Sequence, residues 1–251
     1  MSAALQTTVA LATKNLVAGY ERDLPIVRGV DFRVAEGELV LILGPNGAGK
    51  STLVKAIAGL VPVHSGAIRL GDIDITDVPA HEKIRHGLAF VPQTENIFAT
   101  LSIHDNLLLA ADILPKEKRG GRIAALYAMF PDLAGRPSRR AGALSGGQRQ
   151  MLAVARALVV EPSVLILDEP SAGLSPKIVA EVFTGLKEIN AQGVTIVLVE
   201  QNVKAALAIA DRAVILVEGQ MRHEGTAAGL AGDPLVAELY LGARQHTKAA
   251  P

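Results

Sequence analysis

Residues 39–52 read LVLILGPNGAGKST, an apolar run followed directly by a glycine-rich loop. The loop fits the pattern G-x-x-x-x-G-K-[ST], whose glycines let the backbone wrap around a phosphate chain while the N-terminus of the next helix faces the anion. In this pattern the Lys50 ammonium approaches the outer phosphates, and the Ser51 hydroxyl is a ligand for Mg²⁺. A glycine-rich turn that matches by chance is the alternative, but the apolar run before the loop and the helix-like residues 53–60 after it favour a phosphate-binding loop. Its predicted members are Gly44, Pro45, Asn46, Gly47, Ala48, Gly49, Lys50, Ser51 and Thr52.

Apolar runs of the same kind recur along the chain, at residues 164–167, 195–199 and 213–217. They are rich in Val, Ile and Leu without polar alternation, which is typical of parallel strands that are buried on both faces. Stretches with helical periodicity lie between them. The alternation of strands and helices predicts an α/β fold with a parallel sheet.

The regions on either side of this pattern differ from it. Residues 9–17, 26–34 and 67–75 are expected to form short strands, with turn residues at Gly19, Asp23–Pro25 and Gly71–Asp72. Together they make a small, largely antiparallel sheet beside the parallel core. The segment from about Leu101 to Leu158 is expected to be mainly helical, with breaks at Pro115, Pro131 and residues 135–143. These features indicate one domain with a helical insert.

Composition excludes several classes of protein. The 251 residues include 25 basic and 25 acidic side chains, so the formal charge is zero and a strongly basic nucleic-acid binder is disfavoured. The chain has no cysteine, which excludes disulfides, thiolate metal sites and cysteine nucleophiles. No apolar run approaches the ~20 residues that a membrane-spanning helix needs, and the N-terminus has no signal-peptide pattern. We expect a protein that is soluble or meets the membrane only through partners.

A second motif, Ser163-Val-Leu-Ile-Leu-Asp-Glu-Pro170, is a buried strand that ends in two adjacent carboxylates. Open α/β sheets bind their ligands at this carboxyl edge. Asp168 is therefore a candidate Mg²⁺ ligand, and Glu169 is a candidate base that orients or deprotonates a water. The alternative is that both acids simply cap the next helix.

A third motif, Ala143-Leu-Ser-Gly-Gly-Gln-Arg-Gln150, opens a predicted helix. Ser145 is a good N-cap, and Gly146 and Gly147 expose backbone N–H groups at the positive end of that helix. An ordinary Ser/Gly helix start is the alternative. Because the chain then has two helix starts suited to phosphate, we expect a dimer in which one chain's loop holds the nucleotide and the other chain's Ser145, Gly146, Gly147 and Gln148 cover it.

These three motifs occur in the order and approximate spacing of an ABC-type ATPase, which the chain resembles over about residues 9–242. The resemblance implies a P-loop NTPase fold with a RecA-like parallel-sheet core, an N-terminal antiparallel β subdomain and a helical insert. It places the core and β subdomain at about 9–92 and 159–242, the helical subdomain at about 93–158 and a tail at 243–251. It also implies ATP and Mg²⁺ as cofactors.

Further residues acquire roles only through this resemblance. Tyr20 corresponds to the aromatic that stacks on adenine, with a half-buried strand tyrosine as the alternative. Gln93 corresponds to a glutamine that contacts Mg²⁺ and relays the nucleotide state to a membrane partner. The implied metal ligands are Ser51, Gln93 and Asp168. The implied catalytic residues are Glu169, Gln201 and Gln93. Ser171–Pro176 corresponds to the loop that crosses the dimer interface.

Two positions depart from the family pattern. Ser175 stands where an aspartate is usual, and Gln201 stands at a switch position that is usually histidine. A glutamine amide cannot carry charge, and charge-assisted hydrogen bonds are about twice as strong as neutral ones. We therefore expect slower hydrolysis at the site with Gln201, and a paralogous ATPase partner that has the histidine.

Residues 97–107, 173–176 and 199–202 resemble the smaller ATPase of branched-chain (hydrophobic) amino acid importers. This resemblance implies a second ATPase subunit or a second copy as partner, two membrane permeases, a substrate-binding protein acting indirectly, and no nucleic acid. It also implies a peripheral place at the cytoplasmic face of the inner or plasma membrane, through the membrane subunits. A soluble ABC ATPase in an assembly or scaffold complex is the main alternative, and a non-catalytic nucleotide sensor is a second one. The transported molecule never touches this chain, so its motifs do not identify it.

Overall fold

Two β-sheets organise the protein in the computed structural model, which describes residues 8–94 and 96–233. The smaller sheet has the strand order β2-β1-β4-β5, and the larger has the order β10-β9-β3-β8-β7-β6. The strands are β1 (Val9–Ala18), β2 (Val27–Ala35), β3 (Leu39–Leu43), β4 (Val63–Leu70), β5 (Ile73–Asp74), β6 (Leu88–Val91), β7 (Val164–Asp168), β8 (Thr195–Val199), β9 (Arg212–Val217) and β10 (Gln220–Thr226).

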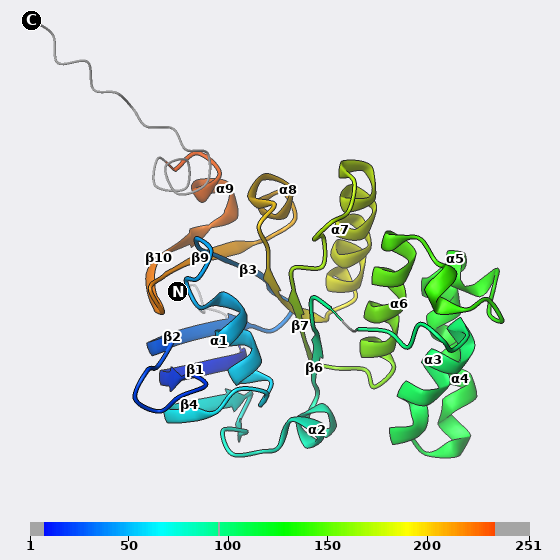
Figure 1. Cartoon of the computed structure of the whole chain (residues 1–251), viewed down its shortest axis with the longest axis horizontal. Helices are drawn as coiled ribbons and strands as arrows, with labels where there is room; N and C mark the ends of the chain where they lie inside the picture. The colour runs from blue at the N-terminus through cyan, green and yellow to red at the C-terminus, as the bar shows by residue number, and fades with distance from the viewer. Residues whose placement is uncertain (1–7, 95, 234–251) are drawn as a thin grey trace, which may run out of the picture.

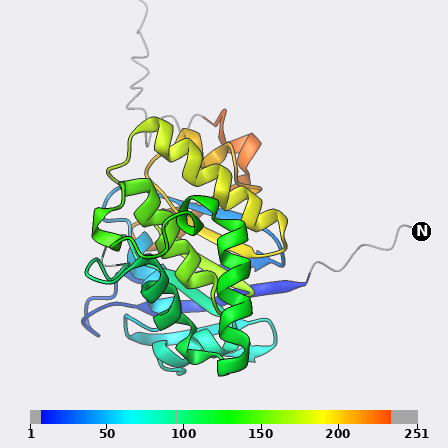
Figure 2. The ribbon, with the colours of Figure 1, turned by 90° about the vertical axis from the view of Figure 1, so that its right-hand side faces the viewer.

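The helices gather mainly around the larger sheet. They are α1 (Lys50–Ile57), α2 (Ala80–Lys83), α3 (Ile103–Ala110), α4 (Lys116–Met129), α5 (Pro131–Ala134), α6 (Gly146–Leu158), α7 (Pro176–Ala191), α8 (Val203–Leu207) and α9 (Ala227–Leu230), with short 3₁₀ turns at Ile84–His86, Ala111–Ile113 and Ala141–Ala143. Figure 1 shows α3, α4, α5 and α6 grouped beyond β6 and β7, and Figure 2 shows this group from the side. In the described part of the chain, no helix combines the length and the apolar character needed to cross a bilayer.

The strands β3, β7 and β8 of the larger sheet are buried on both faces, as the absence of polar alternation predicts. Strand β3 shows this residue by residue. Leu39, Leu41 and Leu43 pack into a core shared with the helical group and α7, whereas Val40 and Ile42 pack into a core shared with α1 and the smaller sheet. Strand β3 pairs in parallel with β8 and β9, and β7 pairs in parallel with β6 and β8. The predicted α/β architecture is confirmed.

The smaller sheet is antiparallel, also as expected, since β1 pairs antiparallel with both β2 and β4. The predicted turn at Gly71–Asp72 interrupts residues 67–75, and the strand before it begins at Val63, earlier than predicted. Gly71 adopts a left-handed φ of 55°, which lets the chain reverse there. The strand therefore ends at Leu70, and Ile73 pairs back onto it as part of β5.

The helical insert contains the predicted breaks. Pro115 precedes α4, Pro131 is the first residue of α5, and an irregular segment separates α5 from α6. We retain as a proposal the division into a core and β subdomain (about 9–92 and 159–242) and a helical subdomain (about 93–158). Residues 234–242 and the predicted tail 243–251 lie outside the described residues.

Candidate functional site

The glycine-rich loop connects β3 to α1 at the carboxyl edge of the larger sheet. Helix α1 begins at Lys50 with no side chain capping its first turn, and its N-cap Gly49 has a left-handed φ of 98°. A Cβ atom on Gly44 would lie 2.2 Å from the carbonyl oxygen of Leu216, so a larger residue would displace the start of the loop. Helix N-termini without side-chain caps leave backbone N–H groups available to an anion. The loop therefore has the geometry of a phosphate site.

Lys50 lies inside this loop and not on the surface. Its Nζ atom donates to the carbonyl oxygens of Gly44 at 2.7 Å and of Pro45 at 3.1 Å. Burial lowers the pKa of Lys50, while the nearby carboxylates of Glu169 and Asp168 act in the opposite direction. The side chain thus brings a positive charge to the centre of the loop, where a phosphate group would accept its hydrogen bonds.

The strand β7 delivers the first carboxylate to the loop. The Ser51 hydroxyl donates to Oδ1 of Asp168 at 2.9 Å, and Asp168 is buried. Burial raises the pKa of Asp168, and the hydrogen bond from Ser51 opposes that effect. Hydroxyl and carboxylate oxygens are hard ligands of the kind that Mg²⁺ prefers. Because no group of three or more His, Asp or Glu side chains in the described ranges could hold a metal by itself, such an ion would also need the phosphate oxygens of its nucleotide.

The alternative role for the two carboxylates, capping the next helix, is wrong. Helix α7 begins only at Pro176, and its N-cap is Ser175. Asp168 and Glu169 lie a full loop earlier, at the end of β7. Their position at the sheet edge is the one in which open α/β sheets bind ligands.

Glu169 is held between two glutamines from neighbouring strands. The Nε2 atom of Gln93, which follows β6, donates to one carboxylate oxygen at 2.9 Å, and Nε2 of Gln201, which follows β8, donates to the other at 2.8 Å. Glu169 has a left-handed φ of 51°, a conformation that is uncommon for residues other than glycine and that clusters at functional sites. Three residues that are far apart in the sequence thus meet in one hydrogen-bonded group.

The third motif forms the start of α6, where Ser145 and Gln148 cap each other. The Ser145 hydroxyl accepts from the backbone N–H of Gln148, and the Gln148 side chain accepts from the backbone N–H of Ser145. The predicted N-cap is therefore confirmed. A Cβ atom on Gly147 would lie 2.4 Å from Cγ2 of Ile178, and one on Gly146 would lie 2.7 Å from a methyl carbon of Leu174. The two glycines thus permit close packing of α6 against α7 and the loop before it.

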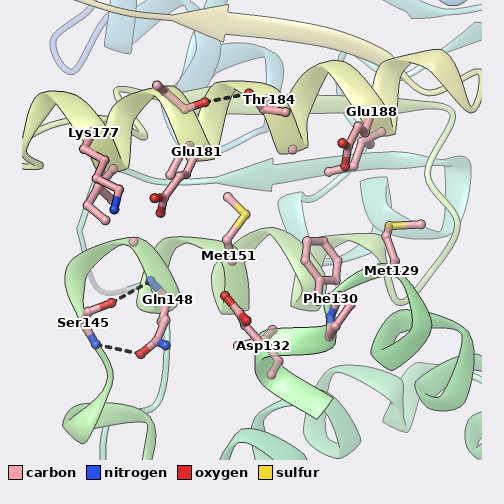
Figure 3. A pocket seen from close by; sticks show the side chains of 18 residues that line it. Met129, Phe130, Asp132, Ser145, Gln148, Met151, Lys177, Glu181, Thr184 and Glu188 are labelled. Atoms are coloured by element: carbon pink, nitrogen blue, oxygen red, sulfur yellow. Dashed lines mark hydrogen bonds between the residues drawn. The ribbon is translucent and has the colours of Figure 1, made fainter. Parts of the chain in front are cut away.

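A groove of about 750 Å³ opens beside this helix start, between α6 and α7. Figure 3 shows Ser145 and Gln148 at one end of it, Met151 at its centre and Glu181 and Glu188 along α7. No residue of the phosphate loop is among the described residues that line it. Figure 1 places α1 and α6 on opposite sides of β6 and β7. Within one chain, the start of α6 therefore lies apart from that chain's own phosphate loop.

Tyr20 lies in the turn between β1 and β2 and is 62% exposed. The alternative of a half-buried strand tyrosine is wrong, because the residue lies after β1 and projects into solvent. The same turn continues into Leu24, Pro25 and Ile26, which line a hollow that also includes Gly47 of the phosphate loop. An exposed ring on this turn is available for stacking on a base.

One buried residue beside the site has no role in the sequence-based prediction. Glu200 is only 1% exposed and accepts hydrogen bonds from the backbone and hydroxyl of Ser171 and from the backbone of Gln201 and Asn202. The signal available in the sequence is an acidic residue directly after a strand that is apolar except for Thr195. Ser175, which departs from the family pattern, is exposed at the start of α7.

Comparisons with known proteins agree with this geometry. Residues 27–172 match the family model described as ABC transporter. The chain is 46% identical over 218 residues to the "Probable branched-chain amino acid transport ATP-binding protein LivF" of Archaeoglobus fulgidus, which covers 86% of this chain and 92% of that protein. It is similar to the solved structure of the ATP-binding cassette MJ1267 of an ABC transporter in its ADP conformation, with a TM-score of 0.83, 29% identity and coverage of 94% of this chain and 100% of the other. It is also similar to the dimeric post-hydrolysis structure of the cassette MJ0796 bound to ADP and Pi, with a TM-score of 0.74, 28% identity and coverage of 86% and 98%.

Proposed function

The chain belongs to the ABC transporter family, and from this premise we propose that it is the ATP-hydrolysing subunit of an importer for branched-chain or other hydrophobic amino acids or amides. The family and its cassette fold make the chain an ATPase. The single observation that supports the choice of solute is the 46% identity, over nearly the whole chain, to a relative named for branched-chain amino acid transport. The proposal of a soluble assembly ATPase has no comparable support.

The chemistry at the site is phosphoryl transfer to water. Backbone N–H groups of the loop and the Lys50 ammonium would bind the outer phosphates of ATP, and Tyr20 would stack on adenine. Ser51, Asp168 and Gln93 would hold Mg²⁺, which when bound neutralises part of the phosphate charge. Glu169, held by Gln93 and Gln201, would orient and deprotonate the attacking water. Catalysis in such sites comes mainly from positioning and electrostatic stabilisation.

A complete site needs two chains. The family works with paired cassettes, as in the dimeric cassette structure to which this chain is similar. We propose that the α6 start of one chain, Ser145 to Gln148, covers the ATP bound on the loop of the other. Because α6 lies away from the chain's own phosphate loop, a head-to-tail arrangement is the simplest one that brings both to one nucleotide. We further propose a paralogous ATPase with histidine at its switch position as the partner, in place of a second copy.

The membrane side of the assembly is also a proposal. Two separate permease subunits would contact the segment after Gln93 and the helical insert, and they would hold the chain at the cytoplasmic face of the membrane. ATP binding would close the two cassettes and hydrolysis would reopen them, and this motion would reach the permeases through the same segment. A soluble binding protein would deliver the solute from the other side.

The test is a gentle detergent purification of the full-length chain from its native membranes, with the co-purifying proteins identified by mass. We expect two polytopic membrane proteins and a second ATPase with a histidine switch. Recovery of the chain only from the soluble fraction, with soluble partners, would contradict the proposal and support an assembly ATPase.

A further inference from the structure

Glu200 is a buried carboxylate that joins two loops of the ATPase site. It follows β8 directly, with a side chain exposed by only 1%. One carboxylate oxygen accepts from the backbone N–H of Ser171 at 2.8 Å. The other accepts from the Ser171 hydroxyl at 2.8 Å and from the backbone N–H of Gln201 at 3.1 Å and of Asn202 at 3.3 Å.

Three backbone N–H groups and one hydroxyl donate to Glu200, and it donates to none of them. The position therefore suits a side chain that only accepts hydrogen bonds. An ionised carboxylate is acceptor-only, whereas a glutamine amide would turn an N–H group toward another N–H group. Burial raises the pKa of Glu200, and the four hydrogen bonds act against that effect. In the described part of the chain, no Lys, Arg or His forms an ion pair with it. The charge is therefore stabilised by the two loops themselves.

These loops hold Glu169 and Gln201, which the proposed function places next to the attacking water. Ser171 lies two residues after Glu169, on the segment that leads to α7, and Gln201 follows Glu200 directly. The backbone N–H of Glu169 also donates to the carbonyl oxygen of Val199 at 2.9 Å, and the Gln201 amide donates to the Glu169 side chain. Three connections thus join the ends of β7 and β8: Glu169 to Val199, Gln201 to Glu169, and Ser171 to Glu200. Of these three, the connection through Glu200 also includes a hydrogen bond to the backbone of Gln201.

We propose that Glu200 is a positioning residue for ATP hydrolysis, which ties Ser171 to the backbone of Gln201 and thereby holds the Gln201 amide against Glu169. The proposal rests on ATP hydrolysis by this chain and is independent of the imported solute. Without the Glu200 carboxylate, the backbone N–H groups of Gln201 and Asn202 lose their acceptor. The backbone at Gln201 is then held less firmly, and so is the orientation of its side chain.

The test compares steady-state ATP turnover of the full-length chain, in the complex in which it is purified, for four versions: wild type, Glu200→Gln, Gln201→Ala and the double variant. A misplaced catalytic group can cost up to ~100-fold, so Glu200→Gln is expected to lower kcat on the order of 10-fold. The KM for ATP should change less than about 3-fold, because the phosphate loop is untouched. In the Gln201→Ala background, the same substitution should lower kcat by less than about 2-fold, since its effect acts through Gln201.

Ser171→Ala provides a second route if Glu200→Gln folds poorly. It keeps the carboxylate, removes one donor, and should lower kcat in the same direction by a smaller factor. Asn190→Ala is the matched control, because the Asn190 amide is also buried and donates to the carbonyl oxygens of Gly37 and Val194, away from the site. It should lower the melting temperature without lowering kcat.

Three results would overturn the proposal. One is an unchanged kcat in Glu200→Gln. The second is a double variant whose loss is the product of the two single losses, which would mean that Glu200 does not act through Gln201. The third is a loss of kcat in Asn190→Ala as large as that in Glu200→Gln, which would mean that Glu200 affects turnover only by stabilising the fold. Because the readout is ATP turnover, none of these results bears on which solute is imported.

Discussion

The Nε2 atom of Gln201 lies 2.8 Å from Oε1 of Glu169, so the ends of the adjacent parallel strands β8 and β7 meet through their side chains. The second oxygen of Glu169 accepts from Gln93. Each carboxylate oxygen has two lone pairs, so Glu169 retains acceptor capacity for a water molecule while both amides hold it in place. The geometry is suited to a base whose orientation is sensitive to its two neighbours.

The first prediction concerns that carboxylate. Glu169→Gln should retain ATP binding, because the phosphate loop is unchanged, and should lower turnover by about 100-fold or more, because the proposed general base is lost. Phosphate release and ATP binding are measured on the same preparation. Glu36→Gln, an exposed change in the turn between β2 and β3, is the control and should behave as wild type. Wild-type turnover in Glu169→Gln would mean that Glu169 is not the general base.

The second prediction concerns the switch position. A protonated imidazole makes charge-assisted hydrogen bonds that are about twice as strong as those of a neutral amide. Gln201→His should therefore raise ATP turnover of the assembled complex, measured at saturating ATP. Turnover that is unchanged or lower would show that the neutral amide of Gln201 does not limit the rate of ATP hydrolysis at this site.

The third prediction concerns the packing of α6 on α7. Gly147→Ala would bring a methyl group within 2.4 Å of Cγ2 of Ile178, so either the start of α6 or the Ile178 side chain on α7 must shift. We expect the changed packing to lower turnover. Ile178→Ala removes that carbon, and the double variant Gly147→Ala with Ile178→Ala should recover most of the lost turnover. If no recovery occurs, the glycine is required for another reason, such as close approach to the partner's nucleotide.

The fourth prediction concerns stability and pH. Lys83 is almost fully buried, its Nζ atom donates to the carbonyl oxygen of Ile57, and burial lowers the pKa of Lys83 to about 8. Between about pH 8 and pH 10.5, the unfolded chain therefore binds more protons at this position than the folded one, and the free energy of unfolding rises with pH. Relative to Lys83→Met, wild type should gain up to about 3 kcal/mol from about pH 7 to about pH 10.

Chemical denaturation at several pH values measures this difference. Lys14→Met, at an exposed position, is the control and should show no such divergence from wild type. Parallel curves for wild type and Lys83→Met would mean that Lys83 is not the buried cation described above.

Much of the fold was predictable because its signals are local. Strand β3 and the loop after it form one continuous pattern, and the capping of α6 follows from Ser145 and Gln148 three residues apart. Strand β10 carries no such signal, since its residues Gln220–Thr226 are mostly polar at the edge of the sheet. Strand β6 is only four residues long, which is too short to show a period.

The residues of the candidate site could be proposed one at a time, but their grouping could not be predicted. A local pattern identifies Glu169, whereas Gln93 and Gln201 were identified only through the family resemblance. Their meeting depends on β6, β7 and β8 being neighbours in the sheet, which no local pattern encodes. The role of Glu200 was missed for the same reason. Its partner Ser171 is 29 residues away in sequence, and an acidic residue after a strand gives no indication that it is buried.

The central claim is that ATP hydrolysis by this chain energises amino acid import, and solute uptake by reconstituted vesicles tests it most directly. The complex that co-purifies with the full-length chain is placed in vesicles with ATP on the cassette side and the soluble binding protein on the other, and uptake of labelled leucine is followed. We predict ATP-dependent uptake with the wild-type chain and with Glu36→Gln, and none with Glu169→Gln. Uptake that is absent with wild type, or that persists at the wild-type rate in a Glu169→Gln complex that does not hydrolyse ATP, would contradict the claim.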